Sequence, residues 1–349
     1  QISVLTEFGD VTTIGFGPKP PDATNHIEVP AHLKTLPQTP RGVLNLALRR
    51  MRASELAAPA IEFALAALDD ERFDLVVANE ARMLALADRV AHGAPIWADM
   101  HEWAPEERTH ILSWRLLVAP LMTYLCETYL PKAYASTTVC DSIADLYRQR
   151  FAIPMRVMRN SGPLRNLAPS AMVGESIRLV HSGAAIHGRN LEATIDVVKQ
   201  LDDRFTLDFF LVPGGDGGAY LTSLIHRAAS CPRIRFNAPV APDALPATLN
   251  AFDIGVFWIP PTHTNARLTL PNKFFDYVQA RLAIAVGPTL EMKHLVDEYN
   301  LGVVSDDYSV QACLESLQRL TPAAIVGFKS HSDRAAHILN FDEDAKVAR

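Results

Sequence analysis

Hydrophobic and polar positions change their period along the first half of the chain, from short apolar runs to amphipathic stretches and back. The short runs predict strands at 73–78, 95–99 and 135–140. The amphipathic stretches predict helices at 43–68 with a break near Pro59, and at 81–91, 106–129 and 141–151. This alternation predicts a parallel sheet flanked by helices. A strand is also predicted at 2–5 or 11–16, and we expect that a first strand with its glycine-rich turn is missing before it.

The segment 160–176 breaks this rhythm with two glycines and two prolines and predicts a linker. In the alternation that follows, the predicted strands are 177–181, 206–212, 234–236, 254–259, 283–286 and 302–304. The predicted helices are 191–201, 219–229, 243–250, 272–280 and 291–296, with a final helical stretch from about 323. The predicted fold class is therefore α/β, with two doubly wound domains at 1–162 and 177–322, a linker at 163–176 and a terminal stretch at 323–349.

Composition and charge narrow the classes of partner. The chain has 349 residues, 48% hydrophobic and 21% charged, which suits two folded domains. A net charge of −6 argues against nucleic acid as the main partner, so any phosphate must be held by a few local groups. The four cysteines are scattered without a C-x-x-C pair, which predicts buried free thiols in a reducing compartment and no zinc site.

One apolar stretch, 116–126, leaves two interpretations open. It is too short to span a membrane and contains Pro120, and no signal peptide is visible. With Trp114, Tyr124 and Tyr129 nearby, it could touch a bilayer or an apolar acceptor. The favoured alternative is a core-facing helix with a proline kink.

The stretch 270–280 carries the most specific chemistry. An apolar strand at 253–259 leads through a polar loop to Pro271, which suits the first position of a helix. The start of that helix would present unpaired N–H groups and a partial positive charge beside Asn272, with a full charge from Lys273. Asp276 could accept hydrogen bonds from hydroxyl groups. The pattern predicts a site for a phosphate attached to a sugar.

Three other segments offer candidate site residues. In the turn 183–189, Gly183 and Gly188 would let a phosphate approach the backbone while Arg189 binds it, with His187 as a weaker candidate. Asp99, His101 and Glu102 follow a predicted strand, where the imidazole could bind a sugar hydroxyl. The glycine-rich segment 214–218 is not a dinucleotide fingerprint; it would let a base or ribose lie against the backbone at Gly214, near Val240.

Taken in order, these segments resemble the large family of GT-B glycosyltransferases that use nucleotide sugars and retain anomeric configuration. The stretch 270–277 is similar to the "LPNK-x-x-E-Y" element of one branch. The segments 99–102, 138–143, 159–163, 180–183 with 188–192, 236–240 and 245–249 are similar to other motifs of the family. The resemblance implies two Rossmann-like domains facing a central cleft, with 323–349 packing back toward the first. It also implies metal-independent sugar transfer without a cofactor.

The resemblance also implies residue roles. Arg189 and Lys273 would bind the donor diphosphate, Asp276 the ribose, and His101 the donor sugar. Backbone N–H groups near Thr269 and Leu270 would bind sugar hydroxyls, and Asp99 and Glu102 would face the acceptor. This chain departs from the family at Ala184, Leu268 and Arg281, where an arginine, a glutamate and a glycine are common.

The predicted function is therefore a glycosyltransferase that moves a sugar from a nucleoside diphosphate to a glycan, lipid-linked or small-molecule acceptor. The expected location is the cytoplasm, with peripheral contact at the inner membrane face left open. One alternative is an epimerase or phosphorylase on the same fold. The other, suggested by the three departures, is a catalytically degenerate paralogue that acts as a partner or activator. The donor base, the sugar and the oligomeric state are not specified by the sequence.

Overall fold

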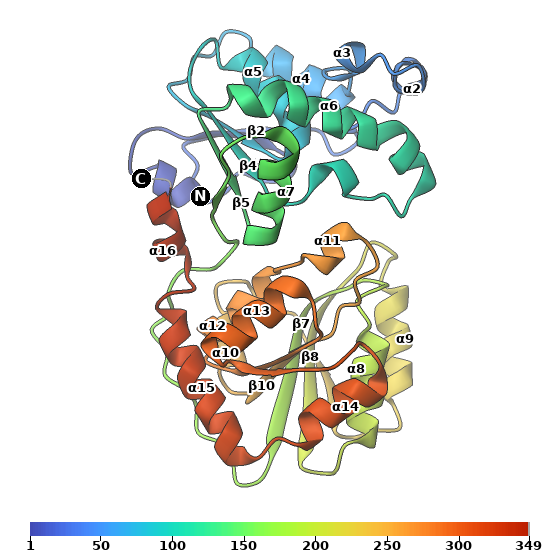
Figure 1. Cartoon of the computed structure of the whole chain (residues 1–349), viewed down its shortest axis with the longest axis vertical. Coiled ribbons are helices and arrows are strands. Elements are labelled where there is room, and N and C mark those ends of the chain that lie inside the picture. Colours follow the sequence, from blue (N-terminus) through green and yellow to red (C-terminus); the bar gives the residue numbers. More distant parts are fainter. Residues whose placement is uncertain (348–349) are drawn as a thin grey trace. The chain divides into compact units, whose positions relative to one another are not determined.

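A computed structural model describes residues 1–347 and divides them into two compact units (Figure 1). The first unit contains Gln1–Met158 together with His263–Asn265, and the second contains Arg159–Thr262 with Ala266–Lys346. The segment predicted as a linker, 163–176, belongs to the second unit. In the described residues, no helix is long and apolar enough to cross a membrane.

The first unit is built on a parallel four-stranded sheet and a separate parallel pair. The four strands lie in the order β3 (Val76–Asn79), β4 (Ile96–Met100), β5 (Ala135–Thr138) and β6 (Arg156–Val157). The pair is β1 (Thr12–Gly15) with β2 (Asn25–Glu28). The helical segments are α1 (Ile2–Leu5), α2 (Pro40–Ala47), α3 (Met51–Ser54), α4 (Pro59–Leu68), η1 (Ala81–Met83), α5 (Leu84–Val90), η2 (Ala104–Glu106), η3 (Trp114–Val118), α6 (Ala119–Tyr129), η4 (Leu130–Lys132) and α7 (Asp141–Phe151).

The second unit contains a six-stranded, wholly parallel sheet. Its order is β12 (Gly302–Val304), β11 (Ala283–Val286), β10 (Ile254–Phe257), β7 (Ile177–Ala185), β8 (Phe205–Pro213) and β9 (Ile234–Asn237). The direction of winding therefore reverses between β7 and β10, as in a Rossmann sheet. The inner strands β10 and β11 are buried on both faces, and apolar side chains of the sheet form the core of the unit.

Helical segments connect the strands of this second sheet, and the last four of them follow its final strand, β12. They are α8 (Leu191–Gln200), α9 (Ala219–Ala228), α10 (Leu245–Leu249), α11 (Thr264–Arg267), α12 (Asn272–Gln279), α13 (Leu290–Tyr299), α14 (Val310–Gln318), α15 (Pro322–Ala336), α16 (Phe341–Asp344) and η5 (Ala345–Val347). Within this unit α15 packs against α12 and β11. Its start is capped by Thr321, whose hydroxyl accepts from the N–H of Ala324 at 3.2 Å.

The predicted elements differ from the structure in four ways: a helix predicted as a strand, missed strands, missed helices and an interrupted helix. The segment 2–5 is helix α1, so its prediction as a strand was wrong; the alternative at 11–16 contains β1. A four-residue apolar run has no period that separates helix from strand. Strands β2 and β6 were not predicted, and neither were helices α11 and α14. The fourth difference lies in the stretch predicted as one helix at 106–129.

That stretch is interrupted rather than continuous. After η2 the chain forms turns and a bend to residue 111, and helix resumes at 112–113, directly before the π-helical turn η3, which leads into α6. Pro120 has no N–H to donate to the carbonyl of Leu116 four residues earlier, which explains the wider turn. The carbonyl of Leu116 instead accepts from the Arg49 guanidinium at 2.6 Å. Trp114, Leu121 and Leu125 are buried, which confirms the core-facing interpretation of α6.

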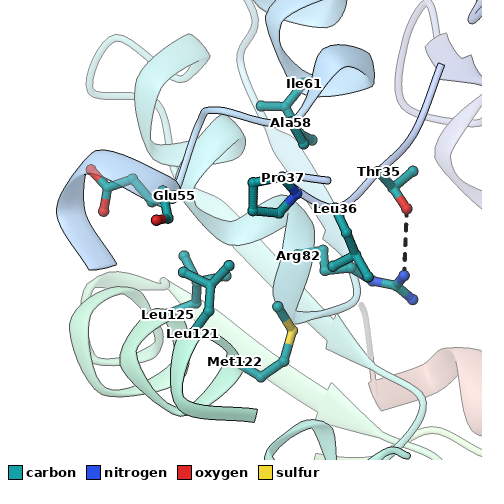
Figure 2. A pocket seen from close by; sticks show the side chains of 11 residues that line it. Thr35, Leu36, Pro37, Glu55, Ala58, Ile61, Arg82, Leu121, Met122 and Leu125 are labelled. Atoms are coloured by element: carbon teal, nitrogen blue, oxygen red, sulfur yellow. Dashed lines mark hydrogen bonds between the residues drawn. The ribbon is translucent and has the colours of Figure 1, made fainter. Parts of the chain in front are cut away.

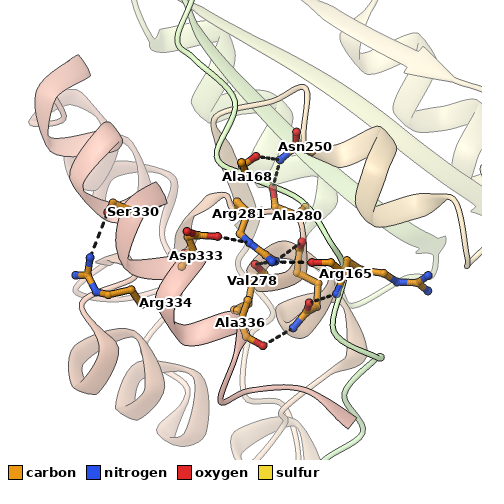
Figure 3. Close-up of polar contacts among 12 residues, drawn as sticks. Arg165, Ala168, Asn250, Val278, Ala280, Arg281, Ser330, Asp333, Arg334 and Ala336 are labelled. Carbon is orange, nitrogen blue, oxygen red and sulfur yellow. Dashed lines mark hydrogen bonds and ion pairs between the residues drawn. The ribbon is translucent and has the colours of Figure 1, made fainter. Parts of the chain in front are cut away.

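Arg281 has a structural role at the position where the family resemblance would place a glycine (Figure 3). The residue has a φ of 61°, a conformation that glycine adopts without strain. Its side chain is 1% exposed. Nε donates to Asp333 at 2.7 Å, and the two terminal nitrogens donate to the carbonyls of Gln279 and Arg165, each at 2.7 Å. One guanidinium thus joins α12, α15 and the segment before β7.

Asp253, at the start of β10, is fully buried between two cations. Arg178 donates to it from Nε, from the backbone N–H and from NH2, each at 2.9 Å. The Lys329 ammonium lies 3.3 Å from Oδ1 and also donates to Ser170 and to the carbonyl of Phe252. The group therefore holds β7, β10 and α15 together at the end of the sheet away from the carboxyl ends of the strands.

Candidate functional site

The reversal of winding places β7 and β10 side by side, and ligands of such sheets bind beyond the carboxyl ends of the strands at this point. The end of β7 and the loop after it carry Arg189 and three residues with a positive φ: Gly183 (φ 131°) in the strand, and Gly188 (φ 85°) and Asn190 (φ 59°) in the loop. The loop after β10 leads through α11 to α12, which carries Lys273 and Asp276. These predicted residues are therefore positioned by the two strands at the switch point.

Gly183, Arg189 and Lys273 come together. A Cβ on Gly183 would lie 2.7 Å from Lys273 Nζ and 3.7 Å from Arg189 NH1. Gly183 therefore leaves room for both cations to approach one backbone position, and its positive φ also requires glycine. Arg189 NH1 donates to the carbonyl of Ala184 at 3.4 Å, so Ala184 contributes its backbone where the family resemblance would place an arginine side chain.

Lys273, in the first turn of α12, is buried. Its ammonium lies 4.4 Å from the centre of the Phe257 ring. Burial, and then the charge of Arg189, lower its pKa to about 7, while Asp276 opposes the shift. Pro271 is also the N-cap of α12 rather than its first residue. The two cations repel each other, and an anion between them would relieve that repulsion.

His181 and Asp276 are two further neighbours that interact with Lys273. His181 was not predicted as a site residue; its Nδ1 donates to the carbonyl of Val256 at 2.8 Å, and its Nε2 lies 3.5 Å from Lys273 Nζ. Burial and the charge of Lys273 hold the pKa of His181 well below its usual value, so the ring is neutral and Nε2 can accept from the lysine. Burial raises the pKa of Asp276 to about 6, against the effect of Lys273.

The lowered pKa of Lys273 predicts a pH dependence of folding. The unfolded lysine, with a pKa of 10.5, binds more proton than the folded one between pH 7 and 10.5, so stability rises with pH in that window. We expect the free energy of unfolding of the wild type to rise by about 2 kcal/mol from pH 7 to 9 relative to Lys273→Met. Urea unfolding of both proteins measures the difference. A constant difference would show that Lys273 has an ordinary pKa in the fold.

A second group of residues lies in the glycine-rich loop after β8. Asp216 accepts from the N–H groups of Gly218 at 3.0 Å and Tyr220 at 2.8 Å, which fixes the start of α9. The His187 ring lies 4.0 Å from the ring of Tyr220, and its Nε2 is 3.7 Å from Asp216. Gly214 packs so closely on the carbonyl of Ala185 that a Cβ would collide with it. The predicted residues His187 and Gly214 therefore lie where this loop meets the loop after β7.

The other predicted donor residues lie elsewhere in the second unit. Val240 is half-buried in the loop after β9. Thr269 and Leu270 lie between α11 and the Pro271 cap, and Asn272 is the exposed first residue of α12. Leu268, where the family resemblance would place a glutamate, is buried.

In the first unit, Asp99 and His101 lie at the carboxyl end of β4. Asp99 is buried and accepts from Thr137 at 2.6 Å and from the side chain of Gln1 at 2.8 Å. His101 Nε2 lies 3.0 Å from Asp99 Oδ2, and this hydrogen bond is the main reason for the raised pKa of His101. Asp99 therefore orients His101 through one ring nitrogen and favours its charged form.

Glu80 is a second residue that the sequence analysis missed. It directly follows β3, the neighbour of β4, and has a φ of 76° and a ψ of 155°, a region that side chains rarely adopt. Burial raises its pKa to about 7, and the nearby His101 opposes that shift. The signal was its place directly after a strand, beside the end of the strand that carries Asp99. Glu102 lies beyond His101 and accepts from the Asn265 amide at 3.2 Å.

A small hollow in the first unit is not a substrate site (Figure 2). It holds about 10 Å³, room for about one water molecule. Its walls are mostly apolar side chains such as Leu36, Pro37 and Leu121. The one hydrogen bond drawn across it joins Arg82 to Thr35 at 3.5 Å. The clustered polar groups described above, and not this hollow, are the candidates for binding a phosphate attached to a sugar.

Neither a protein-family model nor a curated protein sequence matches the chain. Solved structures do. Sucrose-phosphate synthase from Thermosynechococcus elongatus matches with a TM-score of 0.70 at 13% identity, over 99% of this chain and 89% of that one. A trehalose-6-phosphate synthase matches with a TM-score of 0.66 at 11% identity, over 99% and 93%.

A third match is the pneumococcal O-GlcNAc transferase GtfA, solved with UDP and GlcNAc. Its TM-score is 0.63 at 12% identity, over 83% of this chain, and the matched part spans 58% of GtfA. At such identities the shared property is the fold. The predicted fold class is confirmed: the chain is an α/β protein with the GT-B architecture of these glycosyltransferases.

Proposed function

We propose that the protein is a glycosyltransferase that moves a sugar from a nucleoside diphosphate to an acceptor, with retention of configuration. The observation that carries the proposal is the approach of Arg189 and Lys273 to Gly183 at the switch point of the second unit. A pair of cations beside a glycine backbone, with Lys273 buried and Arg189 half-buried, suits a diphosphate, which is compact, doubly charged and able to accept from both side chains.

The same pair would serve the chemical step. When the bond between the anomeric carbon and the diphosphate oxygen breaks, negative charge develops on that oxygen. Fixed donors that are already desolvated stabilise such charge without reorganising. Lys273 donates to the neutral His181 in the structure, so its ammonium is held toward the glycine loop. Asp276, on the same helix, is the proposed ribose partner, and the backbone near Thr269 and Leu270 is proposed to bind donor-sugar hydroxyls.

In the first unit, His101 is the proposed partner of a donor-sugar hydroxyl, oriented by Asp99. Glu102 and Asp99 are proposed to face the acceptor. No protein nucleophile is assigned. In the proposed front-face substitution, the acceptor oxygen bonds to the anomeric carbon on the face that the diphosphate leaves, and a phosphate oxygen takes the acceptor proton. This step requires neither a metal ion nor a cofactor from the protein.

The comparisons suggest which ligands to try first. GtfA was solved with UDP, and the names of two other neighbours indicate sugar-phosphate products. UDP-sugars, with sugars or sugar phosphates as acceptors, are therefore the first donors and acceptors proposed for this chain. Its four cysteines, all among the described residues, are buried and form no disulfide, which fits the proposed cytoplasmic location.

Thermal unfolding with UDP, GDP, ADP and dTDP tests the proposal. A ligand at 100 times its Kd stabilises the folded protein by about 2.7 kcal/mol, which raises Tm measurably. We expect one diphosphate to raise Tm, and its nucleoside to have a much smaller effect because it lacks the charged groups. The matching nucleotide sugar should then release that diphosphate when an acceptor is present. If none of the four raises Tm, the donor site is wrong.

The alternative of a catalytically degenerate partner protein has one observation in its favour. Leu268 is buried and apolar where the resemblance places a carboxylate. The other two departures do not favour it, because Arg281 supports the fold and Ala184 still offers its carbonyl to Arg189. Diphosphate binding without any release from nucleotide sugars, across a panel of acceptors, would support this alternative.

A further inference from the structure

Helix α2 of the first unit exposes apolar side chains to solvent. Its inward residues are Gly42, Asn45 and Leu46, and its outer face carries Val43 and Leu44. Leu48, at the helix end, continues that face one turn beyond Leu44. Leu44 is 55% exposed and Leu48 is 53% exposed. The apolar stripe of a surface helix normally faces the core, so an outward stripe indicates a binding surface.

A second exposed apolar segment lies beside α2. Ile111, Leu112 and Leu116 are exposed, with Leu112 58% exposed. The contact between α2 and η3 and the bond from Arg49 to the carbonyl of Leu116 join the two segments. Pro120 leaves that carbonyl free to accept from Arg49. We call this surface the Leu/Arg face; its apolar members are Val43, Leu44, Leu48, Ile111, Leu112 and Leu116.

The basic members of the Leu/Arg face are Arg41, Arg49, Arg50, Arg52 and Arg115, all exposed. The segments 38–53 and 109–118 contain these five arginines and no aspartate or glutamate. The chain as a whole carries a net charge of −6. Positive charge is therefore concentrated around the exposed leucines of an otherwise acidic protein.

We propose that the Leu/Arg face docks on the surface of a bilayer that contains anionic phospholipids. Leucines that point away from the core can enter the boundary between headgroups and acyl chains, while arginines beside them pair with lipid phosphates. The face includes Leu116, the first residue of the apolar stretch 116–126, whereas Leu121, Met122 and Leu125 of that stretch are in the core. The inference does not depend on the proposed sugar transfer.

A second copy of the chain fits this face less well. A two-fold interface would place the same patch on both sides and bring five arginines against five arginines. Like charges that face each other across an interface weaken it. An anionic bilayer offers the opposite charge together with an apolar layer, so it matches both features of the face.

Sedimentation of the full chain with vesicles tests the proposal. We expect binding to vesicles of phosphatidylglycerol and phosphatidylcholine, at least tenfold less binding to phosphatidylcholine alone, and loss of binding in 0.5 M NaCl. The variant Leu44→Ser/Leu48→Ser should reduce binding at least tenfold. The variant Arg50→Glu/Arg52→Glu/Arg115→Glu should also reduce binding at least tenfold, because it removes the charges that pair with lipid phosphates. This second variant tests the proposal if the serine variant fails to fold.

Matched controls lie on the second unit. Leu290 is 58% exposed and Arg319 is an exposed arginine, so Leu290→Ser and Arg319→Gln change similar groups away from the face and should leave vesicle binding unchanged. Equal binding by the wild type and both face variants, or no binding to anionic vesicles, would overturn the proposal. So would a dimer of the wild type in light scattering that becomes a monomer in Leu44→Ser/Leu48→Ser, because the occupant would then be a second copy.

Discussion

Replacement of Lys273 by methionine is expected to weaken binding of the preferred nucleoside diphosphate by at least tenfold. A hydrogen bond to a charged group contributes about 1.5–3 kcal/mol, which corresponds to about 10- to 150-fold in Kd. Methionine keeps an unbranched chain in the space beside Phe257 and Gly183, but it carries no charge. Calorimetric titration of both proteins at pH 6.5, where the lysine is mostly protonated, measures the change.

The same substitution should not weaken the fold. Burial disfavours the ammonium of Lys273, so its removal should leave stability unchanged or raise it near neutral pH. Loss of binding by a stable protein therefore separates a ligand contact from a structural role. The control is Lys293→Met on α13, where the lysine is half exposed and paired with Asp297 at 2.7 Å. Equal diphosphate affinity in the wild type and Lys273→Met would remove Lys273 from the site.

Replacement of Asp253 by asparagine is expected to lower the free energy of unfolding by about 3–5 kcal/mol. Asparagine is close in shape, but it leaves Lys329, 1% exposed, without a counter-charge in the interior. It also loses acceptors for Arg178. Chemical denaturation of wild type and variant, monitored by fluorescence and circular dichroism, gives the difference if both signals report one transition.

Asp202→Asn is the matched control for this prediction. Asp202 is also bonded by one arginine, Arg204, through two nitrogens at 2.9 Å, but the pair is exposed. Exposed ion pairs contribute about 0–1 kcal/mol, so this variant should unfold almost like the wild type. A loss below 1 kcal/mol in Asp253→Asn would show that water or a shifted lysine pKa compensates for the missing charge.

The elements that could be predicted were those with local signals. Strand β11 and helix α7 have the predicted bounds, because a short apolar run and a full amphipathic helix are read directly from the chain. Helix α14 was not predicted, and 106–129 was predicted as one helix although the stretch contains Pro120. In that stretch Pro120 cannot donate to the carbonyl of Leu116, which instead accepts from Arg49, a residue distant in sequence.

In the candidate site too, features with a local sequence signal could be predicted, and features that depend on distant residues could not. Lys273 and Arg189 were predicted from motifs, and the structure places both beside Gly183. The lowered pKa of Lys273 could not be predicted, because it follows from burial against Phe257 and from the charge of Arg189. His181 lies inside an apolar strand and Glu80 lies outside every motif. Both become candidates only when the strands are placed side by side.

The strand order has a consequence for how the second unit holds together. Strands β7 and β8 are neighbours in sequence and pair over nine residues, from Ile177 to Ala185. Strands β7 and β10 pair at only two positions, and partners across that seam, such as His181 and Val256, are 75 residues apart. Two halves, each built from strands that are near in sequence, therefore meet along a short seam whose contacts join residues far apart in sequence. The loop after β7 and helix α12 lie on opposite sides of this seam. A ligand that binds both Arg189 and Lys273 would therefore link the two halves and stabilise their contact.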